Sequence, residues 1–148
     1  MPCDLGAPGP ALFPELEENE VAASRTGVLP SQDIRDLIAA KRVFAGQEIS
    51  EDQIQPASLD LRLGDVAHRV RASFLPGRER TVAEGLRSLT LHTLDLRDGA
   101  VLERNCIYIV PLLEHLALRY RTSGSANPKS STGRLNVFAR VITDYGTE

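Results

Sequence analysis

The sequence of 148 residues contains no tryptophan, a single methionine and an aromatic fraction of only 5%. A hydrophobic core built from this chain must therefore consist mainly of leucine, valine, isoleucine and alanine. The apolar fraction of 42% and the charged fraction of 25% are nonetheless typical of a soluble globular protein. A chain of this length is enough for one ordinary domain and not for two.

Two further absences exclude classes of protein. The formal net charge of −3 provides no basic face of the kind that nucleic acid requires, so we expect no nucleic-acid partner. The sequence has no apolar run of about 18 residues or more, so we expect no membrane span. The N-terminus also lacks a basic segment followed by an apolar stretch, and we therefore expect no signal peptide.

Cysteine is scarce as well, with Cys3 and Cys106 as the two examples. Cys3 lies in a stretch without a regular pattern and Cys106 lies in a short apolar run, so we expect no disulfide between them. This usage of cysteine is typical of a reducing, intracellular compartment. We therefore predict a cytoplasmic protein.

The order of the residues predicts an N-terminal arm, one short helix and a domain made mostly of strands. Residues 1–27 combine four prolines with an acidic run and no sustained apolar period, which predicts a flexible arm. Ser31 is a candidate N-cap for a helix from Gln32 to Lys41, because apolar residues there recur on one helical face. Residues 28–148 are predicted to form a single β domain.

Most of this domain consists of short apolar runs bounded by turn residues, which favours a barrel, sandwich or jelly roll. The alternation of apolar and polar residues is strictest from Ala57 to Leu63, where Asp60 is more simply a solvated side chain than a buried anchor. A helical turn is possible near 82–87, and a polar loop spans 123–132. The predicted strands are 57–63, 66–74, 89–96, 101–103, 106–110, 116–118 and 135–142, with a hairpin signal at Asp98-Gly99.

The stretch from Lys129 to Arg134, Lys-Ser-Ser-Thr-Gly-Arg, concentrates groups that bind anions. Arginine offers a planar fork that matches phosphate oxygens, and lysine adds a compact charge. Hydroxyls and backbone N–H groups at a bend with glycine can complete the site. The stretch is not a Walker A loop, because Gly-x-x-x-x-Gly-Lys is absent. Composition alone leaves open both a phosphate site and an ordinary polar loop, and the ordinary loop is the commoner.

The sequence predicts no metal centre, because His68, His92 and His115 have no metal-ligand spacing. Zinc-dependent base deaminases carry a His-x-Glu and a Pro-Cys-x-x-Cys motif, and neither occurs in the sequence. A deaminase with this sequence would have to activate water without zinc.

Two motifs together resemble the dCTP deaminase family. Residues 54–64, Ile-Gln-Pro-Ala-Ser-Leu-Asp-Leu-Arg-Leu-Gly, are similar to its early strand motif. Residues 129–135, Lys-Ser-Ser-Thr-Gly-Arg-Leu, resemble its nucleotide-binding motif, a basic residue followed by Ser-Ser-x-x-Arg-Leu. Residues 29–34 resemble the opening helix, and residues 111–118 resemble the segment before the nucleotide motif. The version at 127–134 is similar to the longer bacterial branch, 2′-deoxycytidine 5′-triphosphate deaminase.

The resemblance implies a dUTPase-like distorted jelly roll or β-barrel, assembled as a trimer with sites between subunits. It implies hydrolytic deamination of dCTP to dUTP and ammonia, with Mg²⁺ bound through the triphosphate and no zinc. In such a site Ser130 and Arg134 would be catalytic or would position the reacting groups. The substrate-binding residues that the resemblance implies are Lys129, Ser130, Ser131, Arg134, Val141, Ile142 and Thr143.

The sequence departs from the family where the general base is expected. The family's proton-shuttling carboxylate is a Glu on a later strand, which by the motif alignment falls beyond Glu148, together with the strands that close the jelly roll. The chain is therefore expected to correspond to the N-terminal part of a longer enzyme, and its activity alone is an open question. Two alternatives to a deaminase remain: a non-catalytic nucleotide-binding or assembly module, and a dUTP diphosphatase.

Overall fold

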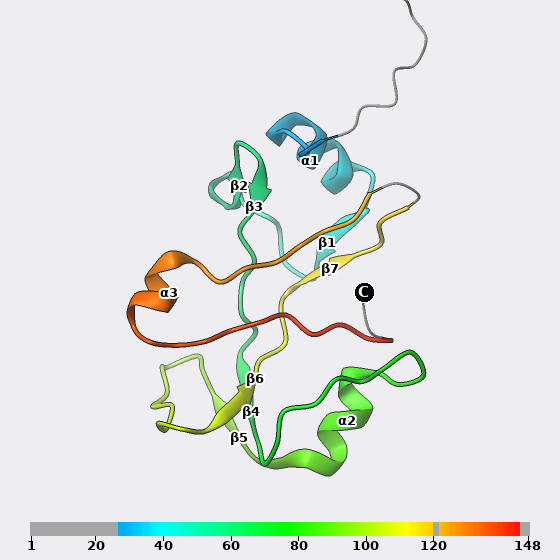
Figure 1. The fold of residues 1–148 in the computed structure, drawn as a ribbon. Helices are drawn as coiled ribbons and strands as arrows, with labels where there is room; N and C mark the ends of the chain where they lie inside the picture. The colour runs from blue at the N-terminus through cyan, green and yellow to red at the C-terminus, as the bar shows by residue number, and fades with distance from the viewer. Residues whose placement is uncertain (1–26, 120–121, 146–148) are drawn as a thin grey trace, which may run out of the picture.

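A computed structural model describes residues 27–119 and 122–145 and shows short strands connected by long irregular segments (Figure 1). The predicted arm lies almost entirely outside these residues. In chain order the elements are α1 (Ser31–Ala39), β1 (Val43–Ala45), the 3₁₀ helix η2 (Glu51–Gln53), β2 (Ile54–Gln55), β3 (Ser58–Leu59), β4 (Val66–Val70), α2 (Val82–Leu89), β5 (Thr90–Asp95), β6 (Ile107–Ile109), β7 (Glu114–Leu116) and α3 (Ser130–Arg134).

The described strands form three small antiparallel sheets, with the orders β1-β7, β2-β3 and β5-β4-β6. The helix α1 and the sheets β1-β7 and β2-β3 lie at one end of the molecule, and β4, β5, β6 and α2 lie at the other (Figure 1). A single bridge between Leu63 and Leu112 joins the two chain segments that cross between the ends. The prediction of a β-rich chain with a short N-terminal helix is confirmed, but these sheets do not close into a barrel within the described residues.

The predicted N-terminal helix is present, with its first turn shifted by one residue. Pro30 is the N-cap, so the assignment of this role to Ser31 is wrong, and the helix ends at Ala39. The backbone N–H of Ser31 donates instead to the carbonyl of Pro56 at 2.9 Å, which ties the start of α1 to the β2-β3 hairpin. The helix buries Ile34 and so contributes to the apolar core.

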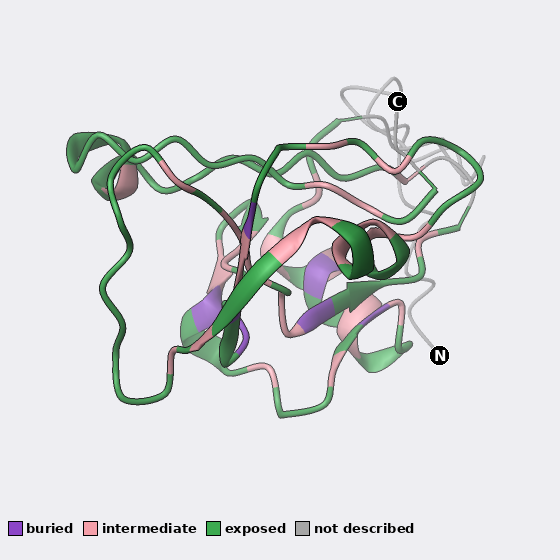
Figure 2. Cartoon of the chain, turned by 90° about the horizontal axis from the view of Figure 1, so that it is seen from below, coloured by how far each residue is buried: buried purple, intermediate pink, exposed green. Residues whose placement is uncertain are grey.

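The apolar core of the described residues is small. It consists of Ile34, Val43, Ala67 and Val70, and Figure 2 shows how few segments are buried. Two polar residues, Gln53 and Glu114, are buried as well. A core in which amides and carboxylates are enclosed beside aliphatic side chains depends on complete hydrogen bonding of those polar groups.

Helix α2 confirms the possible helical turn near residues 82–87. The hydroxyl of Thr81 accepts from the backbone N–H of Glu84 at 3.2 Å, and the Glu84 carboxylate accepts from the N–H of Thr81 at 2.8 Å. This capping box lowers the pKa of Glu84, chiefly through the backbone hydrogen bond of Thr81. The ring of Phe74 lies so close to Gly85 that a Cβ there would come within 2.2 Å of a ring carbon. Glycine is thus required where the helix meets this ring.

Several predicted strands are wrong. Residues 137–143 are irregular, and the predicted strand 57–63 is limited to Ser58–Leu59 and the bridge at Leu63. A turn forms at Gly99, which has a φ of 84°, but residues 101–103 do not continue as a strand, so no hairpin results. Alternation shows that one face of a segment is apolar, but a strand also needs a neighbouring backbone to pair with. Within the described chain, residues 137–143 pair with no strand.

Two predictions from composition concern Cys106 and the membrane. Cys106 is a free thiol, and Cys3 lies outside the described residues. The helices of the described chain are too short and too polar for any of them to cross a bilayer.

Candidate functional site

The stretch from Lys129 to Arg134 forms a single helical turn rather than the loop that the sequence predicts. Lys129 is the N-cap in an extended conformation, and its carbonyl accepts from the N–H of Thr132 at 3.0 Å. Asn136 has a φ of 58° and its N–H donates to the carbonyl of Gly133 at 2.9 Å, which ends the helix. The turn therefore has a defined beginning and end despite a sequence rich in serine and glycine.

This turn places the predicted phosphate-binding groups together on the surface. Ser130 and Arg134 are four residues apart and so lie on the same face of α3. The side chains of Lys129, Ser130, Ser131 and Arg134 are all exposed. Within the described ranges, the guanidinium of Arg134 has no hydrogen-bond or ion-pair partner. A cationic fork, an ammonium group and two hydroxyls are therefore available to a ligand within one turn.

Asp60, which follows β3, binds the start of this turn. The Lys129 ammonium lies 2.7 Å from Asp60 Oδ2, and the same oxygen accepts from Gln55 Nε2 at 3.3 Å. The backbone of Asp60 is held on both sides by Gln53, whose carbonyl accepts from the Asp60 N–H and whose Nε2 donates to the Asp60 carbonyl, each at 2.8 Å. Asp60 is thus a partly buried anchor, and its interpretation as a solvated side chain is wrong.

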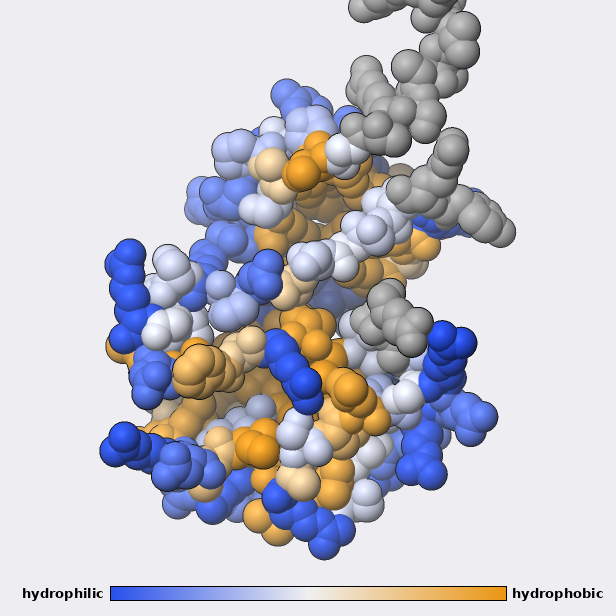
Figure 3. Space-filling view, in the orientation of Figure 1, coloured by the Kyte–Doolittle hydropathy of each residue, from blue (hydrophilic) through white to orange (hydrophobic). Residues whose placement is uncertain are grey.

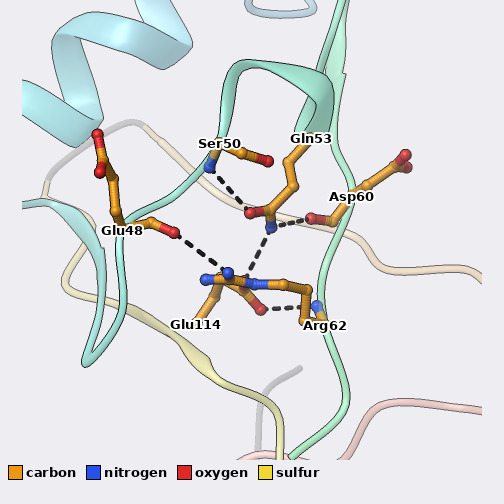
Figure 4. A network of polar contacts seen from close by, with 6 residues as sticks. All are labelled: Glu48, Ser50, Gln53, Asp60, Arg62 and Glu114. Carbon is orange, nitrogen blue, oxygen red and sulfur yellow. Dashed lines mark hydrogen bonds and ion pairs between the residues drawn. The ribbon is translucent and has the colours of Figure 1, made fainter.

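A buried carboxylate, Glu114 of β7, supports this arrangement (Figure 4). Its side chain is 1% exposed and accepts hydrogen bonds from Arg62 Nε and Arg62 N, each at 2.8 Å, and from Gln53 Nε2 at 2.9 Å. Burial alone would raise the pKa of Glu114, but the hydrogen bonds from Arg62 and Gln53 outweigh it and lower the pKa. The ionised carboxylate therefore joins β7 to η2 and to the chain after β3.

Sequence reasoning did not identify Gln53 or Glu114. One available signal was a single carboxylate, Glu114, within residues 111–118, where the other residues except His115 are apolar. A charge at a position that the surrounding pattern marks as buried requires partners. The identity of those partners does not follow from the pattern, because they come from segments 61 and 52 residues away.

The remaining predicted site residues, Val141 to Thr143, lie apart from α3. Asp144 Oδ1 accepts from the N–H of Val82 at 2.6 Å, and the N–H of Tyr145 donates to the carbonyl of Arg80 at 2.9 Å. These contacts hold the segment beside the N-terminal end of α2, on the opposite side of the molecule from α3 in Figure 1. The structure thus gathers Lys129, Ser130, Ser131 and Arg134, but not Val141, Ile142 and Thr143 with them.

Two pockets lie away from this turn. One of about 330 Å³ borders α2 and is lined by residues that include Phe74, Arg80 and Thr81. Another of about 260 Å³ lies beside Arg69, where the guanidinium contacts Cys106 Sγ at 3.0 Å. Among the described residues, no group of three or more His, Cys, Asp or Glu is arranged to hold a metal ion. The exposed turn α3 remains the candidate site.

Comparisons with known proteins identify the family of the chain. Residues 25–148 match the family model of the 2′-deoxycytidine 5′-triphosphate deaminase (DCD) N-terminal domain. The chain is similar to the crystal structure of 2′-deoxycytidine 5′-triphosphate deaminase from Agrobacterium tumefaciens, with 54% sequence identity and a TM-score of 0.78. That similarity covers 83% of this chain and 37% of the other, so the chain spans little more than a third of that relative's length. No curated protein matches the chain significantly. The chain belongs to the dCTP deaminase family, in which it matches the N-terminal domain.

Proposed function

We propose that this chain provides the triphosphate-binding part of an enzyme that hydrolytically deaminates dCTP to dUTP and ammonia, without zinc, in pyrimidine deoxynucleotide metabolism. The observation that carries the proposal is the exposed turn α3 in a chain of this family. Its Lys129, Ser130, Ser131 and Arg134 together offer two positive charges and two hydroxyls.

The chemistry of the turn suits a nucleotide triphosphate. The Arg134 guanidinium can bind two phosphate oxygens at once, the Lys129 ammonium can bind others, and the hydroxyls add neutral hydrogen bonds. These groups are donors, and the neighbouring carboxylate, Asp60, is already paired with Lys129. They therefore fit a Mg²⁺–nucleotide complex in which the phosphate oxygens hold the metal, which would neutralise part of the phosphate charge.

Deamination requires attack of water at C4 of the cytosine ring, a base for that water, and protons for the ring nitrogen and the leaving ammonia. Ser130 would place a fixed dipole near the developing intermediate, and Arg134, bound to the phosphates, would position the nucleotide. In the proposed trimer, Val141, Ile142 and Thr143, which lie apart from α3, would contact through their backbone the base of a nucleotide held by a neighbouring subunit. Asp60 and Asp144 are carboxylates engaged in other contacts, with Lys129 and with the N–H of Val82. The carboxylate base would therefore come from outside the described residues.

The first test is turnover by the 148-residue chain. Because Asp60, the described carboxylate that contacts the turn, is already paired with Lys129, we expect binding of dCTP with little or no release of ammonia. Calorimetric titration with Mg²⁺ and dCTP, together with assays of ammonia and dUTP, measures both quantities. Absence of dCTP binding would contradict the proposal, whereas release of diphosphate from dUTP would favour the alternative function of a dUTP diphosphatase.

If the full-length relative turns over dCTP under the same conditions and this chain only binds it, the chain acts as a nucleotide-binding module. Rapid ammonia release by the chain alone would show that it contains the general base.

Assembly into a homo-oligomer, a trimer, is part of the proposal. Large apolar side chains are exposed in the described residues, and several lie at or after α3: Leu135, Val137, Phe138 and Val141. Space-filling shows apolar residues at the surface beside the hollow between the two ends of the molecule (Figure 3). Apolar surface of this kind is typical of contacts between subunits. Light scattering is expected to give three times the chain mass, and a monomer at micromolar concentration would contradict it.

We propose a cytoplasmic location for the protein.

A further inference from the structure

We propose that Asp60 is a positioning residue that presents the Lys129 ammonium to the triphosphate. This inference rests on the proposed function, because it assigns a role to a residue that would act through Lys129. Asp60 and Lys129 are 69 residues apart in the chain, and their ion pair joins the end of the β2-β3 hairpin to the start of α3.

The position of Asp60 is fixed by its hydrogen bonds. Its backbone N–H and carbonyl are both bound by Gln53, and its carboxylate also accepts from Gln55. Gln53 is itself buried and donates to the enclosed carboxylate of Glu114, which holds it in turn (Figure 4). Asp60 is therefore part of a connected hydrogen-bonded framework.

Lys129 needs a fixed partner of this kind. Its side chain is 67% exposed, and an unrestrained lysine side chain has many rotamers, which a phosphate contact would have to restrict. The ammonium has three N–H donors, of which the bond to Asp60 occupies one, so two remain for phosphate oxygens. The ion pair thus pre-orders the ammonium without preventing it from binding a ligand.

Removal of the Asp60 carboxylate could either strengthen or weaken triphosphate binding, depending on whether repulsion or the ordering of Lys129 is the larger effect. The carboxylate of Asp60 repels a triphosphate at short range, but the Asp60 side chain is 29% exposed and that of Lys129 is 67% exposed, so water reduces this repulsion. The contact with Lys129 is direct and holds the ammonium at one place. We therefore expect removal of the carboxylate to weaken triphosphate binding and not to strengthen it.

The test is a double-mutant cycle on the 148-residue chain, with the Kd for Mg²⁺–dCTP and for inorganic triphosphate measured by calorimetry. Asp60→Asn keeps the shape of the side chain and is expected to raise both Kd values about tenfold, from the lost ordering of Lys129. Lys129→Met is expected to raise them about 30-fold. The double variant is expected to bind as weakly as Lys129→Met alone, because Asp60 acts through Lys129.

The matched control is Asp65→Asn, which removes an exposed carboxylate. The backbone carbonyl of Asp65 accepts from the N–H of Leu96, and the substitution leaves this carbonyl in place. This variant is expected to leave both Kd values unchanged. If Asp60→Asn unfolds the chain, Gln55→Ala loosens the same carboxylate while keeping its charge, and is expected to raise Kd about threefold only where Lys129 is present.

The outcomes separate the two proposals. An unchanged or lower Kd for Asp60→Asn, or equal weakening with and without Lys129, would overturn the role of Asp60. An unchanged Kd for Lys129→Met would instead show that α3 is not the phosphate site, and the proposed function would fail. Weakening by Asp60→Asn that disappears in the Lys129→Met background supports the inference.

Discussion

Replacement of Glu114 by alanine is expected to lower the free energy of unfolding by about 3 kcal/mol, because it removes charge-assisted hydrogen bonds to a buried carboxylate. The Glu114 carboxylate is 1% exposed and accepts from Arg62 and Gln53, so its loss removes the ion pair of Arg62 and a hydrogen bond of Gln53. Arg62 keeps its bond to the Glu48 carbonyl and Gln53 keeps its bond to the Asp60 carbonyl. Since a small apolar core supports the described fold, this loss is a large share of the total stability. Urea unfolding followed by circular dichroism measures the difference.

The matched control is Glu51→Ala. Glu51 also forms an ion pair with an arginine, Arg35 at 2.9 Å, but both side chains are largely exposed. Water replaces such a contact easily, so only a small change of stability is expected. Equal effects of the two substitutions would show that Glu114 is not enclosed as the structure has it.

The dependence on pH provides a second measure of the same interaction. Hydrogen bonds lower the pKa of Glu114 below its usual 4.5 in the folded chain, despite the opposing effect of burial. A carboxyl group with a lowered pKa in the folded state stabilises the fold above its unfolded pKa, and this contribution is lost as the pH falls through the folded pKa. The difference in the free energy of unfolding between the wild type and Glu114→Gln is therefore expected to be largest at pH 7 and to shrink below about pH 4. A constant difference would contradict the assignment of an ionised Glu114.

The parts of the fold that the sequence predicted are those set by local signals. The helix α1 follows from apolar residues on one face, and the helical turn predicted near 82–87 is α2, whose start the side chains of Thr81 and Glu84 cap. The turn at Gly99 also follows from its own residues. In each of these cases, the groups that satisfy the backbone lie within a few residues of one another.

The parts that it did not predict depend on residues far apart in the chain. The alternation at 135–142 predicted a strand, yet this segment pairs with no strand within the described residues. The contacts of Glu114 with Arg62 and Gln53, and that of Asp60 with Lys129, join segments 52 to 69 residues apart. Composition cannot specify which distant segments meet, because that depends on the whole arrangement.

The candidate site was predicted in part from the sequence. Its residue types were visible in the sequence, but the helical turn was not, because serine, threonine and glycine are poor helix formers. What ends the turn is Asn136 in the left-handed conformation, which asparagine adopts more readily than most residues. The motif therefore predicted which groups lie together at this turn, whereas the shape of the turn depends on flanking residues.

Replacement of Arg134 by alanine is expected to raise the Kd for Mg²⁺–dCTP at least 100-fold, which corresponds to about 2.7 kcal/mol. The guanidinium is the group on α3 that can bind two phosphate oxygens with one rigid fork, and charge-assisted bonds of this kind are among the strongest in proteins. Arg134→Lys retains the charge without the fork and is expected to fall between the wild type and alanine. Calorimetric titration of the three chains measures these differences.

The Arg134 side chain makes no hydrogen bond or ion pair with the described fold that the substitution to alanine would remove. Because its guanidinium has no partner within the described ranges, Arg134→Ala is expected to leave the unfolding transition where it is in the wild type. A loss of nucleotide binding then reflects the lost phosphate contact and not a damaged fold. Arg87→Ala, which removes an exposed charge from the last turn of α2, controls for the change in net charge and is expected to bind dCTP normally. Unchanged affinity in Arg134→Ala would remove α3 from the nucleotide site, whatever the relationship of the chain to known deaminases.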